Sequence, residues 1–77
     1  MKAYVLIKVH SGDVPEALRQ LRAAKGVVTA DMTFGPYDAI AVVEAKDLST
    51  IGRIVALDIQ PVVGVLDTLT CLVIEGV

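Results

Sequence analysis

The middle of the chain reads Val27-Val28-Thr29-Ala30-Asp31-Met32-Thr33-Phe34-Gly35-Pro36-Tyr37-Asp38-Ala39-Ile40-Ala41-Val42-Val43-Glu44-Ala45. Residues 27–34 and 38–45 are rich in β-branched and apolar types, which predicts two strands. The Gly-Pro pair between the two runs is typical of a turn. The stretch is therefore predicted to form a hairpin, and the turn places an aromatic hydroxyl, Tyr37, directly beside a carboxylate, Asp38.

A strand and a helix are predicted before this hairpin. Residues 3–9 form another strand-like run, and residues 14–24 carry apolar side chains at helical spacing. Asp13 is the predicted cap of this helix, and Glu16 stands three residues later, as in a capping box. Gly26 is the predicted stop of the helix. Within the strand 27–34, strict alternation assigns one face to Val28, Ala30, Met32 and Phe34.

A second helix and a fourth strand follow the hairpin. Asp47 is the predicted cap of this helix, and Gln60 is its predicted end because proline follows it. The predicted inward stripe consists of Leu48, Ile51, Ile54, Val55 and Ile59. Gly52 is predicted to permit close packing of this helix. Residues 64–75 read as a long strand.

The element order over residues 1–77 predicts a single α+β domain with ferredoxin-like βαββαβ topology. Right-handed crossovers place residues 3–9 and 38–45 at the centre of an antiparallel four-stranded sheet, with both helices on one face. The other face should be polar in a monomer, yet Tyr4 and Leu6 alternate with equally apolar neighbours. This pattern predicts a homodimer of the dimeric α+β barrel type, in which the bare faces pack together.

The composition excludes several classes of function. Of 77 residues 55% are hydrophobic and the mean hydropathy is +0.67, yet no apolar run reaches the roughly 18 residues of a membrane-spanning helix. The net charge of −2 and scattered Lys and Arg argue against direct nucleic-acid binding. No signal peptide is recognisable, so a soluble, cytoplasmic protein is expected. His10 is expected in solvent and Cys71 in the core, so no metal or cofactor site is predicted.

Tyr37 and Asp38 are the best candidates for a polar site. On spacing alone, a tight turn explains them more simply, with Asp38 bonding nearby backbone N–H groups. Such a turn does not require the tyrosine, however. Thr68 and Thr70 alternate on one face of the last strand, and they either pack there or line a small pocket with their hydroxyls.

Two segments together resemble a known family. The Gly-Pro-Tyr-Asp string of residues 35–38 looks like the G-x-Y/F-D motif of the Lrp/AsnC effector domain, also called the RAM domain. Residues 62–75 resemble the closing segment of that domain, in which a Gly-Val pair precedes two alternating threonines. The resemblance covers essentially the whole chain. It implies a sensor rather than an enzyme, which binds a small amino acid without a cofactor.

The resemblance also implies an assembly and a site. Domains of this family dimerise through their sheets, and the dimers form octamers or decamers with the effector at the contact between dimers. The implied ligand-binding residues are Gly35, Tyr37 and Asp38, with Thr68 and Thr70 as further candidates. The carboxylate of Asp38 suits an α-ammonium group, whereas backbone N–H groups and threonine hydroxyls suit a carboxylate.

The sequence departs from the family in two places. Regulators of this family carry a helix-turn-helix before the domain, whereas this sequence starts at the first strand, so a stand-alone module without direct DNA contact is expected. Such a module would mix with full-length Lrp/AsnC regulators or act only as an amino-acid binder. Val63 stands where many members have proline.

Two alternatives remain at this stage. The same dimeric α+β barrel architecture serves small cofactor-independent monooxygenases and isomerases, whose cleft lies inside one monomer. This chain has no Trp or Asn, and offers only His10, Tyr4 and Tyr37 for such catalysis. An amino-acid-binding domain of the ACT type has a similar element order, but the Gly-Pro-Tyr-Asp loop fits it less well.

Overall fold

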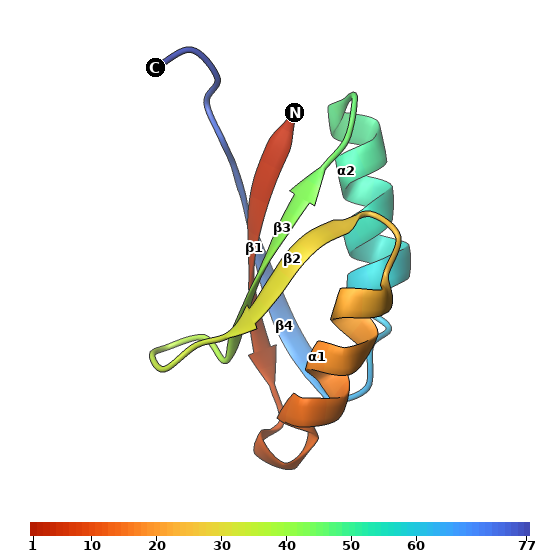
Figure 1. The fold of residues 1–77 in the computed structure, drawn as a ribbon, viewed down its shortest axis with the longest axis vertical. Coiled ribbons are helices and arrows are strands. Elements are labelled where there is room, and N and C mark those ends of the chain that lie inside the picture. Colours follow the sequence, from red (N-terminus) through yellow and green to blue (C-terminus); the bar gives the residue numbers. More distant parts are fainter.

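The computed structural model describes all 77 residues as one four-stranded antiparallel sheet covered by two helices on one face (Figure 1). The elements in chain order are β1 (Lys2–Val9), the 3-10 turn η1 (Ser11–Asp13), α1 (Val14–Ala23), β2 (Val27–Met32), β3 (Ala39–Glu44), α2 (Leu48–Ile54), its π-helical continuation η2 (Val55–Ile59) and β4 (Val65–Leu72). The strand order β2-β3-β1-β4 puts β1 and β3 in the centre. The predicted ferredoxin-like fold is confirmed.

The core lies between the helices and the sheet and is entirely apolar. Alternate residues of the two central strands are buried there, as a strand with one face against helices requires. The predicted stripe of the second helix is buried at four of its five positions. Leu48 is the exception, because its side chain lines a groove beside Leu72 at the outer edge of β4 instead of entering the core.

The two predicted helix caps have different outcomes. Asp47 caps α2 as predicted, since its Oδ1 accepts a hydrogen bond from the backbone N–H of Thr50 over 2.8 Å. The prediction for α1 is wrong, because Asp13 makes no side-chain capping bond. It belongs to the η1 turn, and its backbone is not in the extended conformation that capping needs. Glu16 consequently bonds to side chains farther along α1 rather than back to the cap.

The second strand does not follow the predicted alternation. The pairing of β2 with β3 shifts between Val27 and Thr29, so Val28 bulges out and is exposed. One extra residue exchanges the faces on either side of it, which lets both Val27 and Ala30 enter the core. The strand also ends early, at Met32, and Phe34, predicted to belong to one face of this strand, lies fully exposed in the following loop.

Gly26, and not Gly52, is the glycine that permits close packing against a helix. A Cβ atom on Gly26 would overlap the side chain of Ile54, so this glycine permits the close approach of α2. A Cβ atom on Gly52 would meet nothing within 4 Å, and the prediction of close packing there is wrong. Gly64 has a φ of +80° just before β4, and a Cβ atom there would also overlap Asp13.

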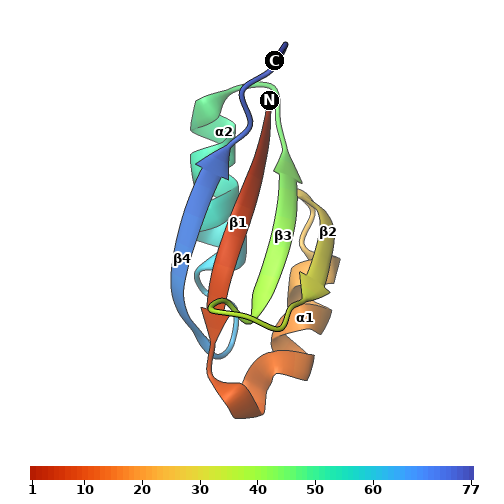
Figure 2. The same cartoon turned by 90° about the vertical axis from the view of Figure 1, so that its left-hand side faces the viewer.

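The open face of the sheet is apolar at its centre, as predicted, and Figure 2 looks onto this face. Cross-strand pairing places the following side chains together on it: Tyr4, Leu6, Ile40, Val42, Leu69 and Cys71. Cys71 is exposed there, so the prediction of a buried thiol is wrong. A second shift in register interrupts the pairing of β1 with β4 between Lys8 and Val9. None of the helices is both long enough and apolar enough to cross a membrane.

Candidate functional site

Asp38 fastens the loop of residues 33–38 to β1. Its Oδ2 accepts a hydrogen bond from the backbone N–H of Val9 over 2.7 Å, and its own N–H donates to the carbonyl of Ile7 over 2.9 Å. Val9 lies beyond Ile7 and Ala39, the last pair of β1 and β3. The carboxylate thus takes the place of a strand partner. The chain is free to leave the sheet here, and in Figure 2 the loop crosses in front of β3.

Thr33 closes the same loop on itself. Its N–H donates to the carbonyl of Asp38 over 3.0 Å, and its Oγ1 donates to the carbonyl of Tyr37 over 2.7 Å. From outside the loop, the Nζ of Lys8 donates to the carbonyl of Pro36 over 3.0 Å. These bonds span the whole turn and give it a defined shape, which is the property a binding loop needs.

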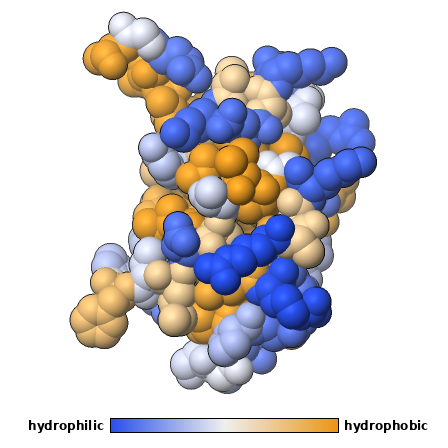
Figure 3. Space-filling model, viewed as in Figure 1, coloured by the Kyte–Doolittle hydropathy of each residue, from blue (hydrophilic) through white to orange (hydrophobic).

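A shallow depression of about 310 Å³ lies between this loop and the open face of the sheet. It is lined by Leu6, Thr33, Phe34, Gly35, Pro36, Tyr37 and Ile40. No charged side chain belongs to this wall. Figure 3 shows an apolar side chain of the loop projecting from the body of the molecule into solvent.

The structure brings part of the predicted site together. Gly35 and Tyr37 both line the depression, and Tyr37 is half-buried. Asp38 does not line it but stands behind the loop, where its carboxylate holds the N–H of Val9. The simpler interpretation, in which Asp38 bonds to a backbone N–H, is therefore correct. The N–H belongs to β1, however, and not to the turn itself.

Thr68 and Thr70 lie on the other side of the sheet. They pair with Ile7 and Val5, whose side chains are buried beneath the helices, so the threonines face the helical layer. The hydroxyl of Thr68 accepts a hydrogen bond from the Nε2 of Gln60 over 3.3 Å. The two threonines share one face, as predicted, but a single chain does not join them to the loop.

Five lining residues were not among the predicted site residues, namely Leu6, Thr33, Phe34, Pro36 and Ile40. Leu6 and Ile40 come from the central strands, and both belong to the open face. Phe34 was predicted to lie in a strand rather than in the loop. Its position directly before Gly35 could have identified it as a site residue. A turn does not require an aromatic residue at that position, just as it does not require Tyr37.

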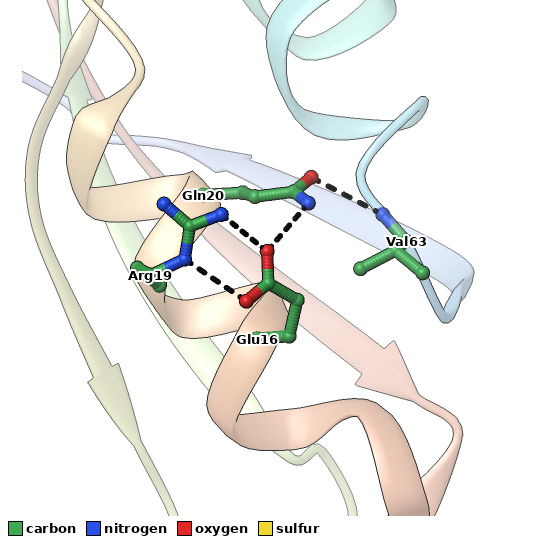
Figure 4. Close-up of polar contacts among 4 residues, drawn as sticks. All are labelled: Glu16, Arg19, Gln20 and Val63. Carbon is green, nitrogen blue, oxygen red and sulfur yellow. Dashed lines mark hydrogen bonds and ion pairs between the residues drawn. The ribbon is translucent and has the colours of Figure 1, made fainter.

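The strongest cluster of charges lies elsewhere, on the surface of α1 (Figure 4). The carboxylate of Glu16 accepts hydrogen bonds from the Nε of Arg19 and the Nε2 of Gln20, both over 2.9 Å. These bonds, that of Arg19 foremost, lower the pKa of Glu16 from 4.5 to about 2. The Oε1 of Gln20 also accepts a bond from the N–H of Val63 over 3.5 Å. The charges of Glu16 and Arg19 pair with each other, and Gln20 links α1 to the segment before β4. The cluster therefore leaves few free polar groups for a ligand.

The remaining candidates for chemistry are dispersed. His10 is exposed, as predicted, and its Nδ1 lies 3.6 Å from the carboxylate of Asp13. No group of three or more His, Cys, Asp or Glu side chains gathers anywhere in the structure.

A ferredoxin-like domain with an apolar open face and a ligand-sized depression at its β2–β3 loop has the architecture of an effector-binding regulatory domain. This chain belongs to the Lrp/AsnC family, because residues 2–77 match the model of the Lrp/AsnC ligand-binding domain. The resemblance of residues 35–38 and 62–75 to that domain is thereby confirmed. No curated protein matches the chain at a significant level.

Solved structures share the fold. TTHA0845 from Thermus thermophilus is 28% identical, with a TM-score of 0.92 and coverage of 99% of this chain and 95% of that chain. AsnC from E. coli is 22% identical, with a TM-score of 0.89 over 97% of this chain and 51% of that one. The regulator NMB0573 from Neisseria meningitidis, in complex with L-Met, is 14% identical, with a TM-score of 0.85 over 99% and 51%. The last two show a common fold.

Proposed function

We propose that this chain is an amino-acid-sensing oligomerisation module related to the Lrp/AsnC transcriptional regulators, and that it acts by binding rather than by catalysis. One observation carries the proposal. The chain matches a ligand-binding family, and hydrogen bonds made by Thr33 and Asp38 hold its β2–β3 loop beside an open depression. A shaped depression with few polar groups is the usual form of a small-molecule site.

The proposed site residues have distinct roles. Gly35 and Tyr37 contact the effector from the wall of the depression, while Asp38 shapes the loop from behind. Thr68 and Thr70 face the helical side, so they contribute hydroxyl groups only when another copy of the chain presents them to the loop.

The proposed assembly begins with a homodimer. The centre of the open face is apolar, and a surface of that kind in a small domain is normally covered by a partner. Dimers then assemble further, into octamers or decamers, with the effector at the contact between dimers. An effector that bridges two dimers favours the larger assembly by mass action. Full-length Lrp/AsnC regulators are the proposed further partners.

The type of effector finds support in a structural neighbour. NMB0573, which has the same fold, was solved with L-Met. A small amino acid is therefore a reasonable effector class for the present chain, whose depression of about 310 Å³ offers enough volume for one.

The enzymatic alternative receives less support. It relies on His10, Tyr4 and Tyr37, and none of the hydrogen bonds in the structure joins two of these side chains. The nearest charged partner of His10 is Asp13, and the ring of Tyr4 lies beneath the Nζ of Lys2 at 5.2 Å. No nucleophile with an adjacent base results from this arrangement.

The test is thermal unfolding of the full chain with each of the twenty amino acids, combined with light scattering. At least one amino acid should raise the midpoint of unfolding and change the assembly size. Tyr37→Ala should weaken this response, whereas Leu57→Ala, a change on the exposed helical side, should leave it intact. Absence of any shift in midpoint or size with all twenty would contradict the proposal.

A further inference from the structure

Two residues of α2 that depart from the predicted packing meet at one place, the groove between α2 and the outer edge of β4. Leu48 turns away from the core and lines this groove, and Gly52 leaves open space in it. We infer that the groove is a further ligand site, which takes a small, uncharged, largely apolar molecule that carries one hydroxyl group. It is distinct from the depression at the β2–β3 loop, because the two lie on opposite sides of the sheet.

The groove contains a pocket of about 330 Å³. That volume is at the lower end of the range of about 300–1,000 Å³ for small-molecule pockets, so a small ligand fits it better than a segment of protein does. Leu48 and Leu72 line opposite sides of the pocket and are 55% and 45% exposed, while Ile51 and Val55, which also line it, are buried. An apolar molecule seated there would cover the exposed parts of both leucines, which the hydrophobic effect favours.

Gly52 keeps the pocket open at a cost to the helix. A glycine inside a helix is less favourable than an alanine. A Cβ atom at Gly52 would meet nothing within 4 Å, so packing within the chain does not require a glycine at this position. Because Gly52 lines the pocket, a long side chain there would occupy the space that a ligand needs. The glycine is thus explained by the pocket and not by the core.

The polar groups of the pocket indicate the type of ligand. No charged side chain lines it, so an ionised group placed there would lose water without gaining a counter-charge. The Oγ1 of Thr70 makes no hydrogen bond within the chain. The Nε2 of Gln60 donates to the hydroxyl of Thr68, which leaves its Oε1 free to accept. A hydroxyl group can donate to one of these oxygens and accept from the other.

The groove remains accessible in the proposed homodimer. Leu72 pairs with Ala3, whose side chain is buried beneath the helices, so Leu72 faces the helical layer, and Thr70 faces the same way. The open face that the dimer covers lies on the other side of the sheet, and Figure 2 shows α2 behind β4 when that face is viewed. All the residues that line the pocket belong to one chain, so the site is complete without a second copy.

The test is a fluorescence titration of the full chain with β-naphthol, a neutral aromatic alcohol, and with β-naphthoate, which has the same rings and a negative charge. The chain contains no Trp, so the fluorescence of the naphthalene rings is read without interference. β-Naphthol should bind saturably, and β-naphthoate should bind at least about tenfold more weakly, because its charge finds no partner.

Two leucine substitutions on neighbouring residues of α2 locate the binding. Gly52→Leu fills the pocket and should weaken binding of β-naphthol by at least about tenfold. Arg53→Leu adds the same side chain outside the pocket and should leave binding unchanged. Thr70→Val keeps the shape of the side chain but removes its hydroxyl. It should weaken binding of β-naphthol about threefold, as loss of one hydrogen bond does, and should not affect binding of naphthalene.

Three results would overturn the inference: no saturable binding of β-naphthol, equal binding of β-naphthoate, or undiminished binding by Gly52→Leu. Circular dichroism checks that Gly52→Leu folds, as expected where the added Cβ meets open space. Leu69→Glu, a change on the open face, should still bind β-naphthol. The proposed amino-acid response depends on contact between dimers and should be lost in the same variant. The inference and the proposed function can therefore fail separately.

Discussion

The carboxylate of Asp38 and the backbone N–H of Val9 lie 2.7 Å apart, and their hydrogen bond replaces a strand partner at the end of β1. Val9 is buried, and its hydrogen bond to Asp38 is partly shielded from water. A side chain therefore completes the hydrogen bonding of a strand, and the position of the β2–β3 loop depends on it.

Replacing Asp38 by alanine should destabilise the fold. The N–H of Val9 would be left buried without an acceptor, which lowers the free energy of unfolding by about 1–3 kcal/mol. Asp38→Asn keeps an oxygen acceptor and should lose less. Urea unfolding of the three proteins measures both effects. An Asp38→Ala variant with parental stability would show that the bond contributes nothing to folding. If the same variant responds normally to the effector, Asp38 is not part of the site.

Alanine at Gly26 and at Gly52 should have opposite effects. At Gly26 the added Cβ overlaps Ile54, and such overpacking costs about 1–3 kcal/mol. At Gly52 it meets open space on a helix, where alanine is about 0.5–1 kcal/mol better than glycine. Thermal unfolding of both variants gives the comparison. The smaller side chain of Ile54→Val should partly relieve the Gly26→Ala defect, and strict additivity of those two changes would argue against direct contact.

Acid should weaken the fold partly through Glu16. The pKa of Glu16 is lowered from 4.5 to about 2 by Arg19 and Gln20, so its ionised form favours the folded state. That contribution is complete above pH 4.5 and is lost as the pH falls through about 2. The parent should therefore lose more stability over this window than Glu16→Gln, measured by urea midpoints. High salt should reduce this difference in stability, because the Glu16–Arg19 pair is exposed. Parallel pH profiles for the parent and Glu16→Gln would contradict the expectation.

A charge on the open face should dissolve the proposed dimer. Leu69→Glu would bury an unpaired carboxylate between two sheets, which weakens association by about a hundredfold or more. Light scattering across a dilution series should then report a monomer. Leu57→Glu, at a more exposed position on the helical side, is the control and should leave the size unchanged. A monomeric parent, or an unaffected Leu69→Glu, would place any association on another surface.

The order of elements and the covered face were predictable because they depend on periodicity. Apolar residues at intervals of two and of three to four mark the strands and helices, and the cap at Asp47 is a local signal. The bulge at Val28 gives no such local signal, because one inserted residue leaves the composition of a strand unchanged. The same holds for Gly26, whose close approach to Ile54 joins elements distant in the chain.

The site was predictable in its location but not in its chemistry. Residues 35–38 identified the loop, and Gly35 and Tyr37 do line the depression. The apolar wall depends on which face the loop turns toward. A long-range contact between Asp38 and β1 determines that direction, and no pattern within the loop records it.

The two shifts in register have a consequence for the geometry of any assembly. They lie in the pairings of both outer strands, β2 with β3 and β1 with β4, and a bulge increases the right-handed twist of the strand that carries it. The open face is consequently a twisted surface with a definite hand. A second sheet that packs on it in the aligned manner would cross it obliquely, at about 30°. The hand of the proposed assembly would thus follow from the twist within the sheet of a single chain.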